Sequence, residues 1–111
     1  MADWTPITLD ELSELVTAQL RECDESDRKL WSETKLSFER RPFRYLADRP
    51  CESFFVVAAL KDAVILYDDV EDGFGIARNE AILCGVYWYE RLVYAIRNLP
   101  EIADELENGN S

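Results

Sequence analysis

The segment SFFVVAALKDAVILYDDVEDGFGIA (residues 53–77) determines the fold. It contains two apolar runs rich in β-branched residues, separated by Lys61 and Asp62, and two such runs joined by two residues predict a β-hairpin. Neither run alternates polar with apolar residues, which is typical of strands that are covered on both faces. The segment therefore predicts a hairpin at the centre of a sheet.

Two helices are predicted on the N-terminal side of this hairpin. Thr8 and Glu11 form a capping box ahead of an amphipathic helix, whose apolar face is Leu9, Leu12, Val16 and Leu20. A shorter helix is predicted within residues 24–35, because Asp24 or Ser26 can cap it and acidic residues crowd its first turn. Its apolar contacts come from Leu30 and Trp31. Together the two segments predict a helical pair.

The segment 36–45 alternates apolar and polar residues, which predicts a strand, and Pro42 interrupts it. Proline cannot donate a hydrogen bond to a neighbouring strand, so we expect an edge strand or a bulged one. The same strand of a second chain could pair with this edge, so we expect either a monomer or a weak dimer.

The C-terminal part is predicted from local composition. The segment AILCGVYWY (residues 81–89) fits either a strand or the start of a helix that runs to Leu99. Its Val, Tyr and Trp residues and the helix-weakening Gly85 favour a strand near 81–87, followed by a helix near 89–98. Pro100 ends that helix or starts another turn, and the acidic residues 101–111 are expected to be frayed. The whole chain, 1–111, is then a single α+β domain with an antiparallel sheet of about four strands, an N-terminal helical pair and a C-terminal helix.

The charge of the chain restricts its partners. The formal net charge is −11, and only the part near residues 35–60 carries more cations than carboxylates. Such a charge repels nucleic acid and anionic membranes and attracts a cationic partner, so we expect neither nucleic-acid binding nor membrane binding. No segment has the length and apolarity of a leader or a membrane span, which predicts a cytoplasmic protein.

The three cysteines, Cys23, Cys51 and Cys84, lack the short paired spacing of zinc sites and are expected to be buried thiols in a reducing compartment. No cofactor is expected. Enzymatic activity is not expected either, because the chain has no histidine and no serine or cysteine in a catalytic motif.

The acidic loop that follows the second strand of the hairpin is the first candidate site. Its carboxylates are Asp68, Asp69, Glu71 and Asp72. They do not fit an EF-hand, since Val70 and Asn79 fall at ligand positions, and no metal is expected. The carboxylates are expected to be mostly exposed, with one paired to an arginine, and Gly73 and Gly75 to adopt backbone angles closed to other residues. The loop is either a solvated hairpin end or, together with Phe74, a docking surface for a basic partner.

The arginines of the 36–45 strand offer an alternative. Arg40, Arg41 and Arg44, beside Trp88, could bind an anion or a small ligand, because the guanidinium group matches phosphate and carboxylate. The same arginines could instead pair with acidic groups of the chain itself. The aromatic residues Tyr87, Trp88, Tyr89 and Tyr94, with Trp31, either fill the core or present an interface.

The segment 53–77, preceded by a leucine-rich helix of the type TLDELSELVTAQLREC, resembles a group of small acidic bacterial proteins. In size and charge the chain is similar to immunity proteins, which neutralise toxins. This similarity, together with the complementarity of an acidic face to a basic partner, leads us to expect a protein-interaction module of the immunity or inhibitor kind. The resemblance assigns no catalytic residue.

Overall fold

The computed structural model describes residues 6–45, 52–69, 72–79, 82–83 and 86–109. In chain order its elements are α1 (Leu9–Gln19), the 3-10 turn η1 (Leu20–Glu22), α2 (Glu25–Thr34), β1 (Lys35–Tyr45), β2 (Glu52–Leu60), β3 (Ala63–Asp68), β4 (Gly73–Arg78), β5 (Ile82–Leu83), β6 (Tyr87–Tyr89) and α3 (Leu92–Gly109). The α+β class is confirmed. Within these residues no helix is both long and apolar enough to cross a membrane.

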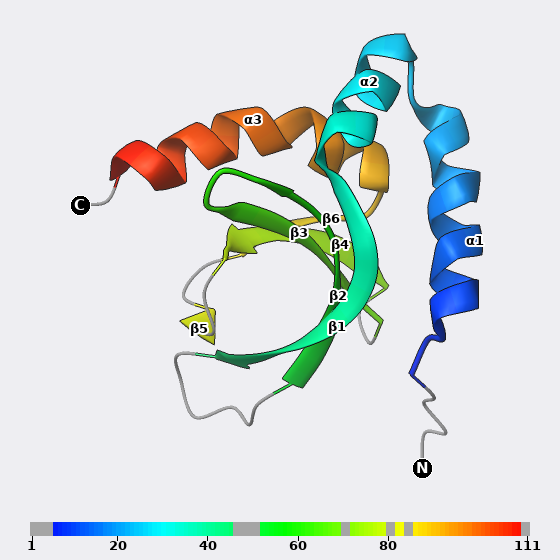
Figure 1. The fold of residues 1–111 in the computed structure, drawn as a ribbon, viewed down its shortest axis with the longest axis horizontal. Helices are drawn as coiled ribbons and strands as arrows, with labels where there is room; N and C mark the ends of the chain where they lie inside the picture. The colour runs from blue at the N-terminus through cyan, green and yellow to red at the C-terminus, as the bar shows by residue number, and fades with distance from the viewer. Residues whose placement is uncertain (1–5, 46–51, 70–71, 80–81, 84–85, 110–111) are drawn as a thin grey trace.

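The sheet has the strand order β5-β1-β2-β3-β4-β6. Its five longer strands pair antiparallel, one more than the sequence predicted, and β5 adds a short parallel pairing to the end of β1. The sheet curls, with α1, α2 and α3 along its outer side (Figure 1). The predicted hairpin is confirmed as β2 and β3, which turn at Lys61 and Asp62. All six residues of β3 are buried, as expected of a central strand.

Each face of the sheet has its own apolar core. On the helix side, Phe55, Val57, Ile65 and Ile76 belong to a cluster with residues of all three helices. On the opposite face the cluster is Phe43, Phe54, Val56, Val64, Leu66 and Ala77. Successive residues of a strand point to opposite faces, so a single apolar run supplies both clusters. This is why the sequence of the hairpin contains no polar alternation.

Both N-terminal helices begin where their caps predict. The side-chain oxygen of Thr8 accepts from the backbone N–H of Glu11 at 3.1 Å, and Glu11 accepts from the N–H of Thr8 at 2.9 Å. Asp24, rather than Ser26, caps α2 and forms a second capping box with Asp27. Helix α2 passes into β1 without an intervening loop, since the helix ends at Thr34 and the strand begins at Lys35.

The C-terminal predictions need correction. The strand expected near 81–87 is two short strands, β5 and β6, on opposite edges of the sheet. The helix begins at Leu92, continues through Pro100 and runs to Gly109, so residues 101–109 are helical rather than frayed. Ile102 and Ala103 continue the buried stripe of α3 at helical spacing. Burial of a large side chain contributes about 1.5–3 kcal/mol, which helps to offset the hydrogen bond that Pro100 removes.

Candidate functional site: a groove beside helix α1

The acidic loop is mostly engaged within the fold. Asp68 is 5% exposed and the side chain of Asp69 is 7% exposed, so the expectation that they are solvated is wrong. Asp69 Oδ2 accepts from Arg40 Nη2 at 3.0 Å and from the backbone N–H of Ile7 at 2.8 Å. Arg40 also donates to the carbonyl oxygen of Ile7 at 3.1 Å. The expectation that one carboxylate pairs with an arginine is confirmed, and this pair holds the residues that precede α1.

The end of the loop is also held by the core. Asp72 is exposed, as predicted, and its carboxylate accepts a hydrogen bond from the hydroxyl of Tyr67. Burial, this hydrogen bond and the neighbouring carboxylates raise the pKa of Tyr67. Phe74 is fully buried and packs on the ring of Tyr67, with 4.9 Å between ring centroids. A fully buried ring cannot contact a partner, so the assignment of Phe74 to a docking surface is corrected; Glu71 lies outside the described residues.

The predicted reason for the glycines is wrong. Among the described residues, positive φ angles occur at Lys61 and Asp72 and at no glycine. Gly75 is required for space, because a Cβ there would lie 2.7 Å from Val86 and from the ring of Trp88. Trp88 therefore packs over β4 from the neighbouring strand β6, and is 43% exposed.

The arginines of β1 do not form one site with Trp88 in the described part of the chain. Arg40 lies over the ring of Phe55, 4.4 Å from its centroid, and is paired with Asp69. Arg41 donates to Asn79 Oδ1 at 3.2 Å. Three strands separate β1 from the strand of Trp88 in the sheet order. The side chain of Arg44 lies outside the described residues, and the anion-binding alternative stays a prediction.

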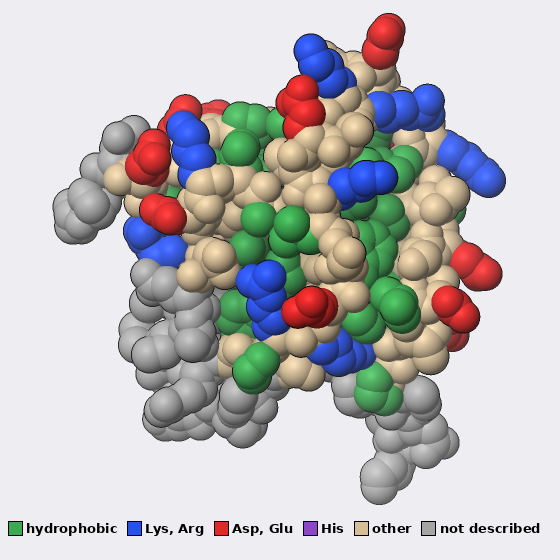
Figure 2. Space-filling model, in the orientation of Figure 1, with side chains coloured by type: hydrophobic (Ala, Val, Ile, Leu, Met, Phe, Trp, Pro, Cys, Tyr) green, Lys and Arg blue, Asp and Glu red, His purple; other side chains and the backbone are tan. Residues whose placement is uncertain are grey.

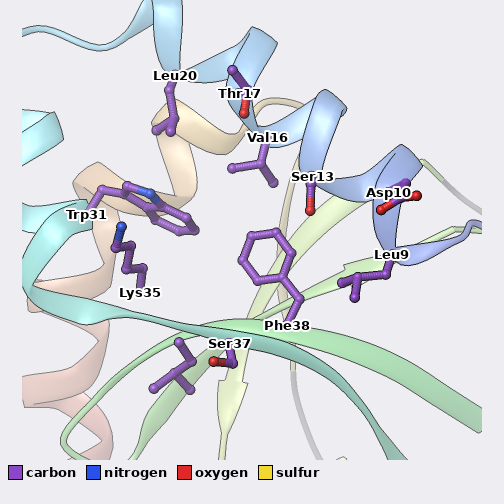
Figure 3. A pocket seen from close by; sticks show the side chains of 11 residues that line it. Leu9, Asp10, Ser13, Val16, Thr17, Leu20, Trp31, Lys35, Ser37 and Phe38 are labelled. Atoms are coloured by element: carbon purple, nitrogen blue, oxygen red, sulfur yellow. The ribbon is translucent and has the colours of Figure 1, made fainter.

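A groove lies between α1 and the beginning of β1. Its volume is about 720 Å³, and its apolar lining comes from Leu9, Val16, Leu20, Trp31, Leu36 and Phe38. Figure 3 shows Phe38 pointing from β1 towards α1, with Trp31 beside it. The two rings meet edge to face, with 6.4 Å between centroids. Leu9 is 49% exposed at one end of the groove, so apolar surface remains open to solvent.

Contacts at both ends of α1 fix the width of this groove. At the N-terminal end, Ile7 is held by Asp69 and Arg40 through the bonds described above. At the C-terminal end, the side-chain oxygen of Gln19 accepts from the backbone N–H of Leu92 at 2.6 Å. This buried bond also satisfies one of the free N–H groups at the start of α3. Helix α1 is thus attached at two points, and the groove is preformed.

Small side chains stand on the side of α1 between the groove and a second hollow. Ser13 and Thr17 line the groove and also a second hollow of about 350 Å³ on the outer side of α1, together with Glu14, Ala18 and Arg21. Small residues one helical turn apart allow another backbone to approach closely. The two hollows therefore form one surface that runs along α1, which we call the α1 surface.

Charge is separated along the α1 surface. Asp10, Glu11 and Glu14 are exposed near the N-terminal end of α1, and Arg21, Arg28 and Lys35 are exposed near its other end. Figure 3 places Asp10 and Lys35 at opposite ends of the groove. Figure 2 shows hydrophobic side chains between α1 and β1, acidic ones along α1 and basic ones at its upper end.

The carboxylates nearest the basic end are paired with arginines of the C-terminal part. Glu22 binds Arg91, and Arg97 binds Asp27 at 2.9 Å and Asp24 at 3.9 Å. The hydrogen bond from Arg97 lowers the pKa of Asp27. Glu22, Asp24 and Asp27 are thus engaged by arginines of the C-terminal part of the chain.

The cysteines provide no site in the described residues. Cys23 is buried, as predicted, and desolvation, with the charge of Asp27, raises the pKa of its thiol. Cys51 and Cys84 lie outside the described residues. Within the ranges that the structure describes, no group of three His, Cys, Asp or Glu residues could hold a metal ion.

The sequence indicates several of the residues that line the groove, but it does not predict that they enclose a groove. Leu9 and Trp31 were assigned to apolar faces. A bulge was one of the two expectations for β1, but the register shift lies between Lys35 and Glu39 and not at Pro42, which pairs with Ser53. Comparisons with protein-family models, with curated proteins and with solved structures found no match.

Proposed function

We propose that this protein is an interaction module that binds a basic partner protein at the α1 surface. The observation that carries the proposal is the preformed groove between α1 and β1, in which Leu9 and the partly buried Leu20 and Phe38 keep apolar surface open. Full burial of a leucine contributes about 1.5–3 kcal/mol, so half-exposed Leu9 leaves roughly 1 kcal/mol to be gained when a partner covers it.

Charge favours a basic partner. The net charge of −11 attracts cations at long range, and the exposed carboxylates Asp10, Glu11 and Glu14 direct them to the N-terminal end of α1, away from Arg21, Arg28 and Lys35. Such fields increase the rate of association, while burial of apolar anchors slows dissociation. The acidic docking face is therefore on α1 and not on the loop of Asp68 and Asp69, because those two carboxylates are buried or paired.

This function agrees with the resemblance to small acidic immunity proteins. A module of this kind acts by covering a functional surface of its partner, and it needs no catalytic group of its own. We propose an inhibitor or immunity-like role in the cytoplasm, with the preformed groove as the element that selects the partner.

A capture experiment with matched variants tests the proposal. Extract of the source cells is passed over the immobilised native chain, over a groove-filling variant, Ser13→Gln with Thr17→Gln, and over a control, Ser26→Gln with Ser32→Gln on α2. All four serine and threonine positions are exposed, so each variant should keep the native thermal midpoint.

We expect the native chain and the control to retain the same basic protein, and the groove-filling variant to lose it. Retention should decrease at high salt because charge contributes to binding. The retained protein, once purified, should perturb the amide resonances of α1 in the native chain. Equal retention by the groove-filling variant, or perturbations confined to other elements, would refute the proposed site.

A further inference from the structure

We infer that the segment the groove receives is an amphipathic α-helix of about three turns, which lies antiparallel to α1 with its cations beside Asp10. This inference rests on the proposed function and specifies the shape and polarity of the partner. It follows from the length of the groove, from the irregular backbone of β1 and from the charges at the two ends.

The groove follows one face of a helix. Its lining positions on the N-terminal helical segment recur every three or four residues, at Leu9, Ser13, Val16 and Leu20. At a rise of 1.5 Å per residue this face is roughly 17 Å long, which equals about three helical turns. A partner helix of that length presents apolar residues at positions i, i+3 or i+4, and i+7 to such a groove.

The wall of the groove opposite α1 is formed by β1, and it fits a partner helix better than an added partner strand. Between Lys35 and Glu39 the register of β1 against β2 shifts, so the backbone there is bulged, and Pro42 lacks the N–H donor further along the strand. An added strand needs regular donors and acceptors along its neighbour. A helix satisfies its own backbone groups and needs only side chains of the wall, here the partly exposed Phe38, behind which the buried Trp31 packs.

Small side chains make room for the partner backbone. Ser13 and Thr17 stand on the face of α1 that both hollows share, and both are exposed. Packed helices lie about 8–10 Å apart, and the distance is shorter where the contact residues are small. The partner helix can therefore lie against α1 and reach Phe38 with its apolar stripe.

The charges set the direction of the partner. Asp10 lies at one end of the groove and Lys35 at the other, so the partner should bring cations to the first end and carboxylates to the second. Cations stabilise the last turn of a helix and carboxylates stabilise the first turn. A helix with this arrangement has its C-terminal end beside Asp10, which places it antiparallel to α1.

A selection from random peptides tests this inference without knowledge of the partner. Phage displaying random 16-residue peptides are selected on the native chain, with depletion on the groove-filling variant Ser13→Gln with Thr17→Gln. A second selection uses a polarity-swapped variant, Asp10→Lys with Lys35→Asp. The thermal midpoint of each variant is measured first, to show that it is folded.

We expect the native chain to enrich peptides with apolar residues at helical spacing and with Lys or Arg in the last turn. The best peptide, made synthetically, should bind the polarity-swapped variant roughly tenfold more weakly, because two attractive pairs become repulsive. The swapped variant should enrich peptides with the opposite charge order. Selected peptides with apolar residues at every second position, or peptides that bind the polarity-swapped variant as tightly as the native chain, would overturn the inference. Either result would leave the proposed function in place. Failure to enrich any groove-dependent peptide would overturn both.

Discussion

Removal of the Asp69 carboxylate tests whether the acidic loop attaches α1 to the sheet. The side chain of Asp69 is 7% exposed and accepts from Arg40 at 3.0 Å and from the N–H of Ile7 at 2.8 Å. Hydrogen bonds to a buried charge contribute about 1.5–3 kcal/mol each, and the 28% exposure of Arg40 reduces its share. We expect Asp69→Ala to lower the free energy of unfolding by about 2–3 kcal/mol.

Urea unfolding followed by circular dichroism measures this loss. The matched control is Asp104→Ala, which removes an ion pair to Lys61 in which both side chains are largely exposed, and it should lower the free energy of unfolding by less than about 1 kcal/mol. In a double-mutant cycle, Arg40→Ala and Asp69→Ala should be coupled by about 1–2 kcal/mol. A loss of less than about 0.5 kcal/mol for Asp69→Ala would show that the loop is merely solvated and that α1 is held in another way.

Three further substitutions test other parts of the structure. Gly75→Ala should lower the free energy of unfolding by about 1–3 kcal/mol and shift the fluorescence of Trp88, because the new Cβ would lie 2.7 Å from that ring; an unchanged spectrum would contradict the packing. The lowered pKa of Asp27 means that its contribution to stability is present above the unfolded pKa of about 4 and is lost as pH falls through the folded value. Asp27→Asn should therefore flatten the decrease of the thermal midpoint in acid, and a decrease as steep as that of the native chain would refute the role of Arg97. Ile102→Ala should cost about 2–4 kcal/mol in urea unfolding, whereas a frayed tail would make the substitution nearly neutral.

The sequence predicted the helix starts and the hairpin turn, because these depend on residues that lie close together in the chain. The capping box of Thr8 and Glu11, the cap at Asp24 and the two-residue turn at Lys61 act within a few residues, and each is confirmed. The continuous helix through Pro100 was not predicted, because proline was taken as the end of the helix or the start of another turn, although Ile102 keeps the helical period of the apolar stripe.

The groove and the role of the acidic loop could not be predicted because they depend on distant contacts. Asp69 meets Ile7 across 62 positions and Arg40 across 29 positions, and no local pattern pairs them. A cluster of carboxylates looks the same in sequence whether it is solvated or engaged. Phe74 is buried because β4 pairs with β3 and packs against α3, and these contacts are also set by the tertiary structure.

The two attachments of α1 have a consequence for synthesis on the ribosome. Helix α1 leaves the ribosome before the residues that hold it in place. Ile7 bonds to Asp69, 62 positions later, and Gln19 bonds to the N–H of Leu92, 73 positions later. The helix must therefore wait, with Leu12 and Val16 uncovered, until the sheet and the start of α3 have been made. Until then the nascent chain exposes the apolar face of this amphipathic helix, and the helix is the segment of the domain that a ribosome-associated chaperone should bind first.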